Sequence, residues 1–83
     1  MVYEILFTNS ARRELVKLDA VVKKTIKIKL LQLQENPLKY AKKLHNNDLG
    51  GYRWRVGSYR VIFDLEKSRI IVLKIAHRRD VYK

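Results

Sequence analysis

The sequence predicts an α+β fold in which a two-helix antiparallel hairpin packs on one face of a mostly antiparallel sheet. Three observations lead to this prediction. Between residues 11 and 33 apolar residues recur at helical spacing, whereas from residue 52 onward they alternate with polar residues, as in a half-buried strand. Short turn sequences separate these segments. With 83 residues, of which 47% are hydrophobic, the chain is expected to form one domain over residues 1–83.

The first half of the chain predicts one strand followed by two helices. Residues 2–7 are short and rich in apolar and aromatic residues, as an opening strand is. The segment 8–10 offers three suitable N-caps for the first helix, and the sequence leaves open which one serves. Asp19 is expected to cap the second helix, and Asn36-Pro37 to end it. The short connection between the two helices predicts an antiparallel hairpin. The apolar stripe of the second helix is Val22, Ile26, Leu30 and Leu33.

The second half predicts a β-meander, so the expected order is β-α-α-β-β-β. Residues 37–51 have the composition of an irregular loop that contains lysines and ends in two glycines. Residues 52–56 and 59–65 then form a hairpin around Gly57-Ser58, a pair suited to a type II′ turn. Residues 69–76 are β-branched and form the third strand of the meander.

The net charge of +11 indicates a polyanionic partner, and nucleic acid is the first candidate. Residues 1–38 hold 7 basic against 4 acidic residues, whereas residues 39–83 hold 12 against 4, so the excess lies in the second half. The absence of cysteine excludes disulfides and Cys-based zinc sites, and the two histidines lack metal-ligand spacing. We expect no metal and no cofactor. The N-terminus is too short for a signal peptide and no apolar run approaches a membrane span, so a cytoplasmic location is expected.

Arginines occupy one face of the predicted hairpin. Alternation directs the apolar and aromatic residues of both strands towards the helices, and therefore directs three arginines to the opposite face: Arg53, Arg55 and Arg60. Neighbouring strands lie about 4.8 Å apart, so the guanidiniums share one patch, and their repulsion is relieved when an anion binds between them. A solvated surface is the simpler alternative, but the absence of interleaved glutamate favours a phosphate-binding surface.

Three motifs resemble the RelE/ParE superfamily of toxins from toxin–antitoxin systems, and the RelE-like branch most of all. They are Tyr-Arg-x-Arg at 52–55, Gly-x-Tyr-Arg-Val-Ile at 57–62 and His-Arg-x-x-Val-Tyr at 77–82. Each is weak alone, and their order and spacing make the combination specific. The resemblance covers essentially the whole chain and implies the RelE-like fold.

The resemblance implies a ribosome-dependent, metal-independent mRNA endonuclease that cuts the codon in the A site. The 2′-OH attacks the adjacent phosphate and leaves a 2′,3′-cyclic phosphate and a 5′-OH end. Arg53 and Arg55 match two basic residues of the family. The family assigns one of these to phosphate binding and the other to activating the nucleophile. Arg60 matches the arginine that stabilises the transition-state phosphate, and Arg78 the arginine that protonates the leaving 5′-oxygen. Tyr82 matches the tyrosine that stacks on or orients the target nucleotide.

Other residues are secondary candidates. Lys42, Lys43 and Arg79 are expected to add attraction for RNA phosphates. Histidine is a residue type that serves in acid–base catalysis, but parity along the last strand groups His77 with Ile71, Leu73 and Ile75. It is therefore either a packing or capping residue at the strand end or a catalytic acid or base.

The expected partners are an acidic RelB-like antitoxin, the ribosomal A site and mRNA, with no membrane. The second predicted helix carries further apolar residues among its lysines, which either pack on the first helix or receive a partner. The resemblance implies that this partner is an acidic antitoxin that folds on binding. Two other functions stay open. The His-Arg-x-Asp ending also occurs in ParE-type inhibitors of DNA gyrase, which are not nucleases, and the arginine face could serve a non-catalytic nucleic-acid-binding module.

Overall fold

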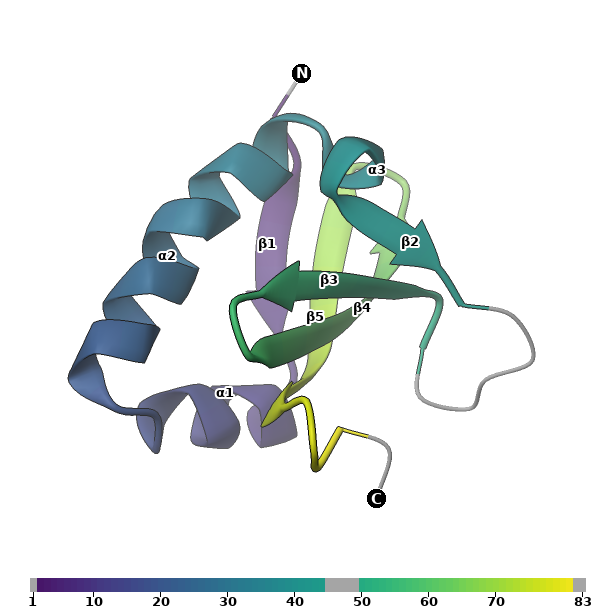
Figure 1. Ribbon diagram of the computed structural model, residues 1–83. Helices are drawn as coiled ribbons and strands as arrows, with labels where there is room; N and C mark the ends of the chain where they lie inside the picture. The colour runs from purple at the N-terminus through teal and green to yellow at the C-terminus, as the bar shows by residue number, and fades with distance from the viewer. Residues whose placement is uncertain (1, 45–49, 82–83) are drawn as a thin grey trace.

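The computed structural model of the chain describes residues 2–44 and 50–81. Five strands form one sheet in the order β1-β5-β4-β3-β2, in which β1 and β5 run parallel and every other pair antiparallel. The helices cover one face of this sheet (Figure 1). The fold class is therefore confirmed. The elements are β1 (Glu4–Phe7), α1 (Asn9–Val16), α2 (Ala20–Glu35), α3 (Pro37–Tyr40), β2 (Ala41–Lys43), β3 (Tyr52–Val56), β4 (Tyr59–Glu66) and β5 (Arg69–His77).

Side-chain caps fix the starts of the two long helices. Thr8 is the N-cap of α1, and its hydroxyl accepts a hydrogen bond from the backbone N–H of Ala11 at 3.1 Å. Asp19 caps α2 as predicted, and its carboxylate accepts from the N–H of Val21 at 3.1 Å. Helix α2 ends at Glu35, just before the predicted Asn36-Pro37 stop.

The helix pair is more open than the predicted antiparallel hairpin. From their connection α1 and α2 diverge at a wide angle (Figure 1). The cause lies in what each helix packs against. Helix α1 lies along the last part of β5, where Glu14 accepts a hydrogen bond from the backbone N–H of Ile75 at 3.1 Å. Helix α2 crosses the face of the sheet instead, so the two helices share little surface.

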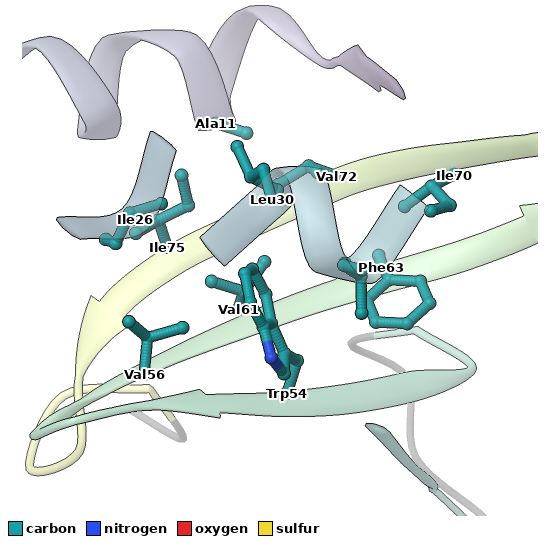
Figure 2. Packing of buried hydrophobic residues seen from close by; sticks show 11 residues of the cluster. Ala11, Ile26, Leu30, Trp54, Val56, Val61, Phe63, Ile70, Val72 and Ile75 are labelled. Atoms are coloured by element: carbon teal, nitrogen blue, oxygen red, sulfur yellow. The ribbon is translucent and has the colours of Figure 1, made fainter. Parts of the chain in front are cut away.

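The core lies between α2 and the helix-facing side of the sheet. The α2 stripe buries Ile26, Leu30 and Leu33 as predicted, while Val22 is half-buried. Figure 2 shows the facing strand residues beneath the helix, with Ala11 of α1 completing the cluster. These buried strand residues are Trp54, Val56, Val61, Phe63, Ile70, Val72 and Ile75. Since they alternate along β3 and β4, their neighbours face away from the helices.

The prediction of an irregular loop over residues 37–51 was wrong for its first part. Pro37 begins the short helix α3, where a missing N–H is tolerated at the first turn. Strand β2 follows and pairs with β3 at the edge of the sheet. Only 3 residues belong to β2, too few for an alternating pattern to indicate a strand.

A register shift in β5 corrects the predicted parity of that strand. Val72 pairs with Phe63, but the next pair is Lys74 with Ile62, so Leu73 is inserted as a β-bulge. Ile75 and His77 therefore lie on the helix-facing side, whereas Ile71 and Leu73, which were expected to share that side, lie on the other. The predicted grouping fails because a bulge reverses the alternation of a strand.

The face of the sheet away from the helices is called here the outer face, and Gly50 and Gly51, just before β3, pack on part of it. The N–H of Gly51 donates to the carboxylate of Asp64 at 2.6 Å. A Cβ atom at Gly50 would lie 2.8 Å from Cγ2 of Ile62 and 2.8 Å from Cδ1 of Leu73, so glycine is required at this close approach. Ile62 is consequently buried although it lies on the outer face.

Candidate functional site

Two of the predicted arginines face each other beside the β3–β4 turn. Arg55 of β3 and Arg60 of β4 are direct partners in the antiparallel register, one pair away from the Val56–Tyr59 pair that closes the hairpin. Both lie on the outer face, because their neighbours Trp54 and Val61 are buried in the core. Directly opposed like charges destabilise a sheet, and an anion between them removes that penalty.

Arg60 is anchored to the turn itself. Its Nη1 donates to the carbonyl oxygens of Gly57 at 3.2 Å and of Tyr59 at 3.1 Å. Gly57 has φ 59°, and Lys67 is the only non-glycine residue with positive φ among those described, which fits the predicted type II′ turn. The turn geometry thus sets the position of the Arg60 guanidinium before any ligand binds.

Arg78 is brought to the same turn by the end of β5. Its backbone N–H donates to the carbonyl oxygen of Ser58 at 2.8 Å. The chain then turns, with the N–H groups of Asp80 and Val81 donating to the carbonyl of His77 at 2.8 and 3.1 Å. Val81 is 0% exposed and holds the tail against the protein, while the Arg78 side chain is exposed. Hydrogen bonding and burial therefore place Arg55, Arg60 and Arg78 at one end of the hairpin; we call these three residues the turn cluster.

The remaining basic candidates are divided between the two faces of the sheet. Arg53 pairs with Ile62 on one side and with Lys42 on the other, so Arg53 and Lys42 lie together on the outer face. Lys43 pairs with Tyr52 and points to the opposite face. Both lysines were expected to add attraction for RNA phosphates from an irregular loop; they lie in a strand instead, in which adjacent residues face opposite ways. Arg79 is exposed in the turn after β5.

His77 packs at the strand end and does not face the turn cluster. It pairs with Tyr59 on the helix-facing side, and the two rings meet edge to face with centroids 5.4 Å apart. Its Nδ1 accepts a hydrogen bond from the N–H of Arg79 at 3.2 Å. Of the two roles left open by the sequence, this geometry favours packing and capping.

Tyr82 is the last of the predicted site residues. Tyr82 lies outside the described residues, so its assignment stays a prediction. Lys74 was not among the predicted residues; the β5 register places it beside Ile62 on the outer face. Alternation relative to Ile75 could have indicated Lys74 from the sequence. Glu14, which holds the last part of β5, could not have been found, because its contact joins residues 61 positions apart.

Comparison with known proteins identifies the family. The family model described as the ParE toxin of type II toxin–antitoxin system, parDE, matches residues 5–82. This chain belongs to the RelE/ParE superfamily of type II toxins. Toxin RelG of Mycobacterium tuberculosis is similar to this RelE/ParE toxin over its whole length, with 31% identity over 86 residues that cover 100% of the chain and 99% of RelG.

Solved structures of RelE-type toxins share the fold. The M. tuberculosis toxin–antitoxin complex RelBE2 contains a chain with a TM-score of 0.83 and 27% identity, covering 94% of this toxin and 100% of that chain. A free-state mutant of Escherichia coli RelE gives a TM-score of 0.81 at 24% identity, covering 99% and 90%. The RelB–RelE complex of Methanococcus jannaschii gives 0.74 at 28% identity, covering 94% and 95%. Two of these three relatives were crystallised with a RelB antitoxin.

None of the helices in the described residues has the length and hydropathy that a membrane span requires.

Proposed function

We propose that this toxin is a ribosome-dependent mRNA endonuclease that inhibits translation by cutting the A-site codon. The observation that carries the proposal is the turn cluster: Arg55 of β3 and Arg60 of β4 face each other, and Arg78, directly after β5, is bonded through its backbone to the same turn. Guanidiniums bind phosphate oxygens in a bidentate manner, which suits a phosphodiester at this point. The similarity to RelG and to RelE structures supports the proposed endonuclease function. Action on ribosomes implies a cytoplasmic location.

In the proposed reaction the 2′-oxygen of the A-site nucleotide forms a bond to the adjacent phosphorus while the bond to the 5′-oxygen breaks. The 2′-hydroxyl releases its proton to water and the leaving 5′-oxygen gains one, giving a 2′,3′-cyclic phosphate and a 5′-OH end. Arg60, fixed by the turn carbonyls, stabilises the charge on the equatorial phosphate oxygens. Arg78 supplies the proton to the leaving oxygen. Arg53 and Arg55 divide phosphate binding and nucleophile activation, and Tyr82 stacks on the nucleotide.

The same chemistry explains why a ribosome is needed. A guanidinium stabilises negative charge well but stays protonated at physiological pH, so it exchanges protons poorly. A site made of arginines is therefore weak on flexible RNA. Holding the mRNA in near-attack geometry removes most of the entropic barrier, and the ribosomal A site supplies that geometry.

Removing the Arg60 side chain tests the proposed transition-state contact. Arg60→Ala should slow single-turnover cleavage of ribosome-bound mRNA by about 10²–10³-fold, as loss of one preorganised donor does. Arg60→Lys should be intermediate, because it keeps the charge and loses the planar fork. Arg69→Ala is the matched control, since Arg69 lies at the other end of the sheet in an exposed ion pair with Glu4. Equal rates for Arg60→Ala and Arg69→Ala would reject the assignment.

An acidic RelB-like antitoxin is the proposed protein partner. Apolar side chains are exposed on α2, with Val21 73%, Ile28 54% and Leu31 64% accessible. Lys23, Lys24 and Lys27 lie in the same surface groove as Ile28 and Leu31. A groove that combines apolar and cationic side chains fits an acidic amphipathic segment that orders on binding.

A second candidate function is inhibition of DNA gyrase without nuclease activity. It is favoured by the description of the matching family model, which is that of a ParE toxin. A gyrase supercoiling assay separates the two functions. Inhibited supercoiling together with intact ribosome-bound mRNA supports the ParE-type function, whereas cleavage with unaffected gyrase supports the endonuclease.

A further inference from the structure

Strand β5 extends beyond the end of its parallel neighbour β1. Phe7, the last residue of β1, pairs with Val72, and the N–H of Thr8 donates to the carbonyl oxygen of Val72 at 3.0 Å. The remaining part of β5, residues 73–77, is paired only with β4. Its backbone groups on the β1 side therefore need partners from outside the sheet.

The N-cap of α1 and a glutamate of the same helix supply those partners. The carboxylate of Glu14 accepts a hydrogen bond from the N–H of Ile75 at 3.1 Å, and the hydroxyl of Thr8 donates to the carbonyl oxygen of Leu73 at 3.5 Å. Glu14 thus takes the place that a carbonyl group of β1 would occupy if that strand were longer. Its bond joins an ionised acceptor to a backbone donor, which is the stronger kind of hydrogen bond.

The Glu14 carboxylate serves the strand and not an ion pair. Lys17 lies three residues further along α1, at the spacing of a helix-surface ion pair, yet among the residues that the structure describes Glu14 forms no ion pair. Ile75 is 3% exposed, so without Glu14 its N–H would lack an acceptor inside the protein. A buried donor without an acceptor is unfavourable, and this part of β5 would have to shift to reach water.

The anchored segment lies just after the β5 bulge. A bulge leaves its inserted residue unpaired and disrupts the ladder at that point. Leu73 is the inserted residue, and pairing with β4 resumes at Lys74. The Glu14 bond to Ile75 therefore holds the strand on the β1 side where pairing on the β4 side begins again.

The same segment carries the third arginine of the turn cluster. Ala76 pairs with Arg60, and two residues later the N–H of Arg78 donates to the carbonyl oxygen of Ser58 at 2.8 Å. The position of Arg78 relative to Arg60 thus depends on where the end of β5 lies. A displacement of about 1 Å in a catalytic group can lower a rate by about 10²-fold.

We propose that Glu14 is a positioning residue for Arg78. By accepting the N–H of Ile75, it fixes the end of β5 and so sets where the Arg78 guanidinium meets the leaving oxygen. The consequence for cleavage rests on the proposed endonuclease function. Glu14 acts through the strand and takes no part in proton transfer.

Single-turnover cleavage of ribosome-bound mRNA tests this role. Glu14→Ala should lower the rate constant at saturating toxin by about 10–10²-fold, because Arg78 is displaced, and should leave the half-saturating toxin concentration unchanged. Glu14→Gln should cut within about threefold of the wild-type rate, since an amide oxygen accepts the same bond. Glu35→Ala is the control, because it removes the same charge at the exposed end of α2.

A double variant separates positioning from a general loss of stability. In an Arg78→Ala background, Glu14→Ala should slow cleavage no further, because the group that it positions is already gone. An equal slowing in both backgrounds would overturn the proposal. A Glu14→Ala toxin that cuts as fast as Glu35→Ala would overturn it as well.

Amide hydrogen exchange measures the anchor independently of cleavage. In Glu14→Ala the amides of Ile75 and Arg78 should exchange about 10-fold faster, as the loss of one hydrogen bond predicts. The amide of Glu4, which donates to Ser68 at the other end of β5, should keep its wild-type rate. Should Glu14→Ala fail to fold, Glu14→Asp, whose carboxylate is one methylene shorter, takes its place with the same expectations.

Unchanged exchange at both amides would overturn the anchor. If the wild-type toxin leaves ribosome-bound mRNA intact, the endonuclease function is overturned. Faster exchange confined to Ile75 and Arg78 would in that case leave the anchoring of Arg78 by Glu14 standing.

Discussion

An Arg78→Ala toxin should cut ribosome-bound mRNA about 10²–10⁴-fold more slowly than the wild type, the range for loss of a positioned proton donor. The backbone N–H of Arg78, which bonds to Ser58, is unchanged in this variant, so the chain keeps its path at the turn. The lost group acts where charge develops on the leaving oxygen. The effect should therefore fall on the single-turnover rate constant at saturating toxin, which is the quantity to measure.

Arg12→Ala is the control for this prediction, since Arg12 is an exposed arginine on α1. Binding of a ten-nucleotide RNA with 2′-O-methyl groups throughout, which cannot undergo attack by a 2′-OH, should be only modestly weaker in Arg78→Ala than in Arg12→Ala. We call this probe the 2′-O-methyl RNA. If the two variants cut equally fast, or if the slower cleavage of Arg78→Ala comes entirely from weaker RNA binding, Arg78 does not act in the chemical step.

The second large effect concerns stability. Phe63→Ala should lower the free energy of unfolding by about 3–5 kcal/mol, through lost transfer energy and the cavity that remains. Phe63 is 0% exposed, and its ring stacks on Tyr52 with centroids 5.4 Å apart. Because a small domain is stable by only about 5–15 kcal/mol, much of that margin would be lost. Urea unfolding followed by circular dichroism gives the value.

Ile28→Ala is the matched control, because Ile28 is a large apolar residue that is 54% exposed on α2. It should change the free energy of unfolding by less than about 0.5 kcal/mol. A loss for Phe63→Ala no larger than that of Ile28→Ala would mean that the face of β4 packed under α2 is not the core.

The parts of the fold that could be predicted are those with a clear period. The stripe of α2 and the alternation in β3 and β4 each indicate one buried face, and both are confirmed. Strand β2 has 3 residues and no period, so it was missed. The apolar run Ile70–Leu73 gives no sign of which side faces the core, and the bulge within it was therefore invisible.

The candidate site likewise has features that the sequence predicts and features that it does not. The Arg55–Arg60 pairing follows from the turn at Gly57-Ser58, because hairpin register is fixed by the turn. The faces of Lys42 and Lys43 could not be predicted, since the strand that carries them was not foreseen. The support of β5 by Glu14 depends on tertiary packing of α1, which local patterns do not encode.

Cleavage of mRNA in programmed 70S ribosomes, mapped by primer extension, tests the endonuclease claim most directly. Wild-type toxin should produce cuts inside the A-site codon, and naked mRNA incubated with the same toxin should stay intact. The upstream fragment should end in a 2′,3′-cyclic phosphate. Intact mRNA on ribosomes, with toxin shown to be folded and able to bind the 2′-O-methyl RNA, would contradict the claim and leave the arginine face as a binding surface.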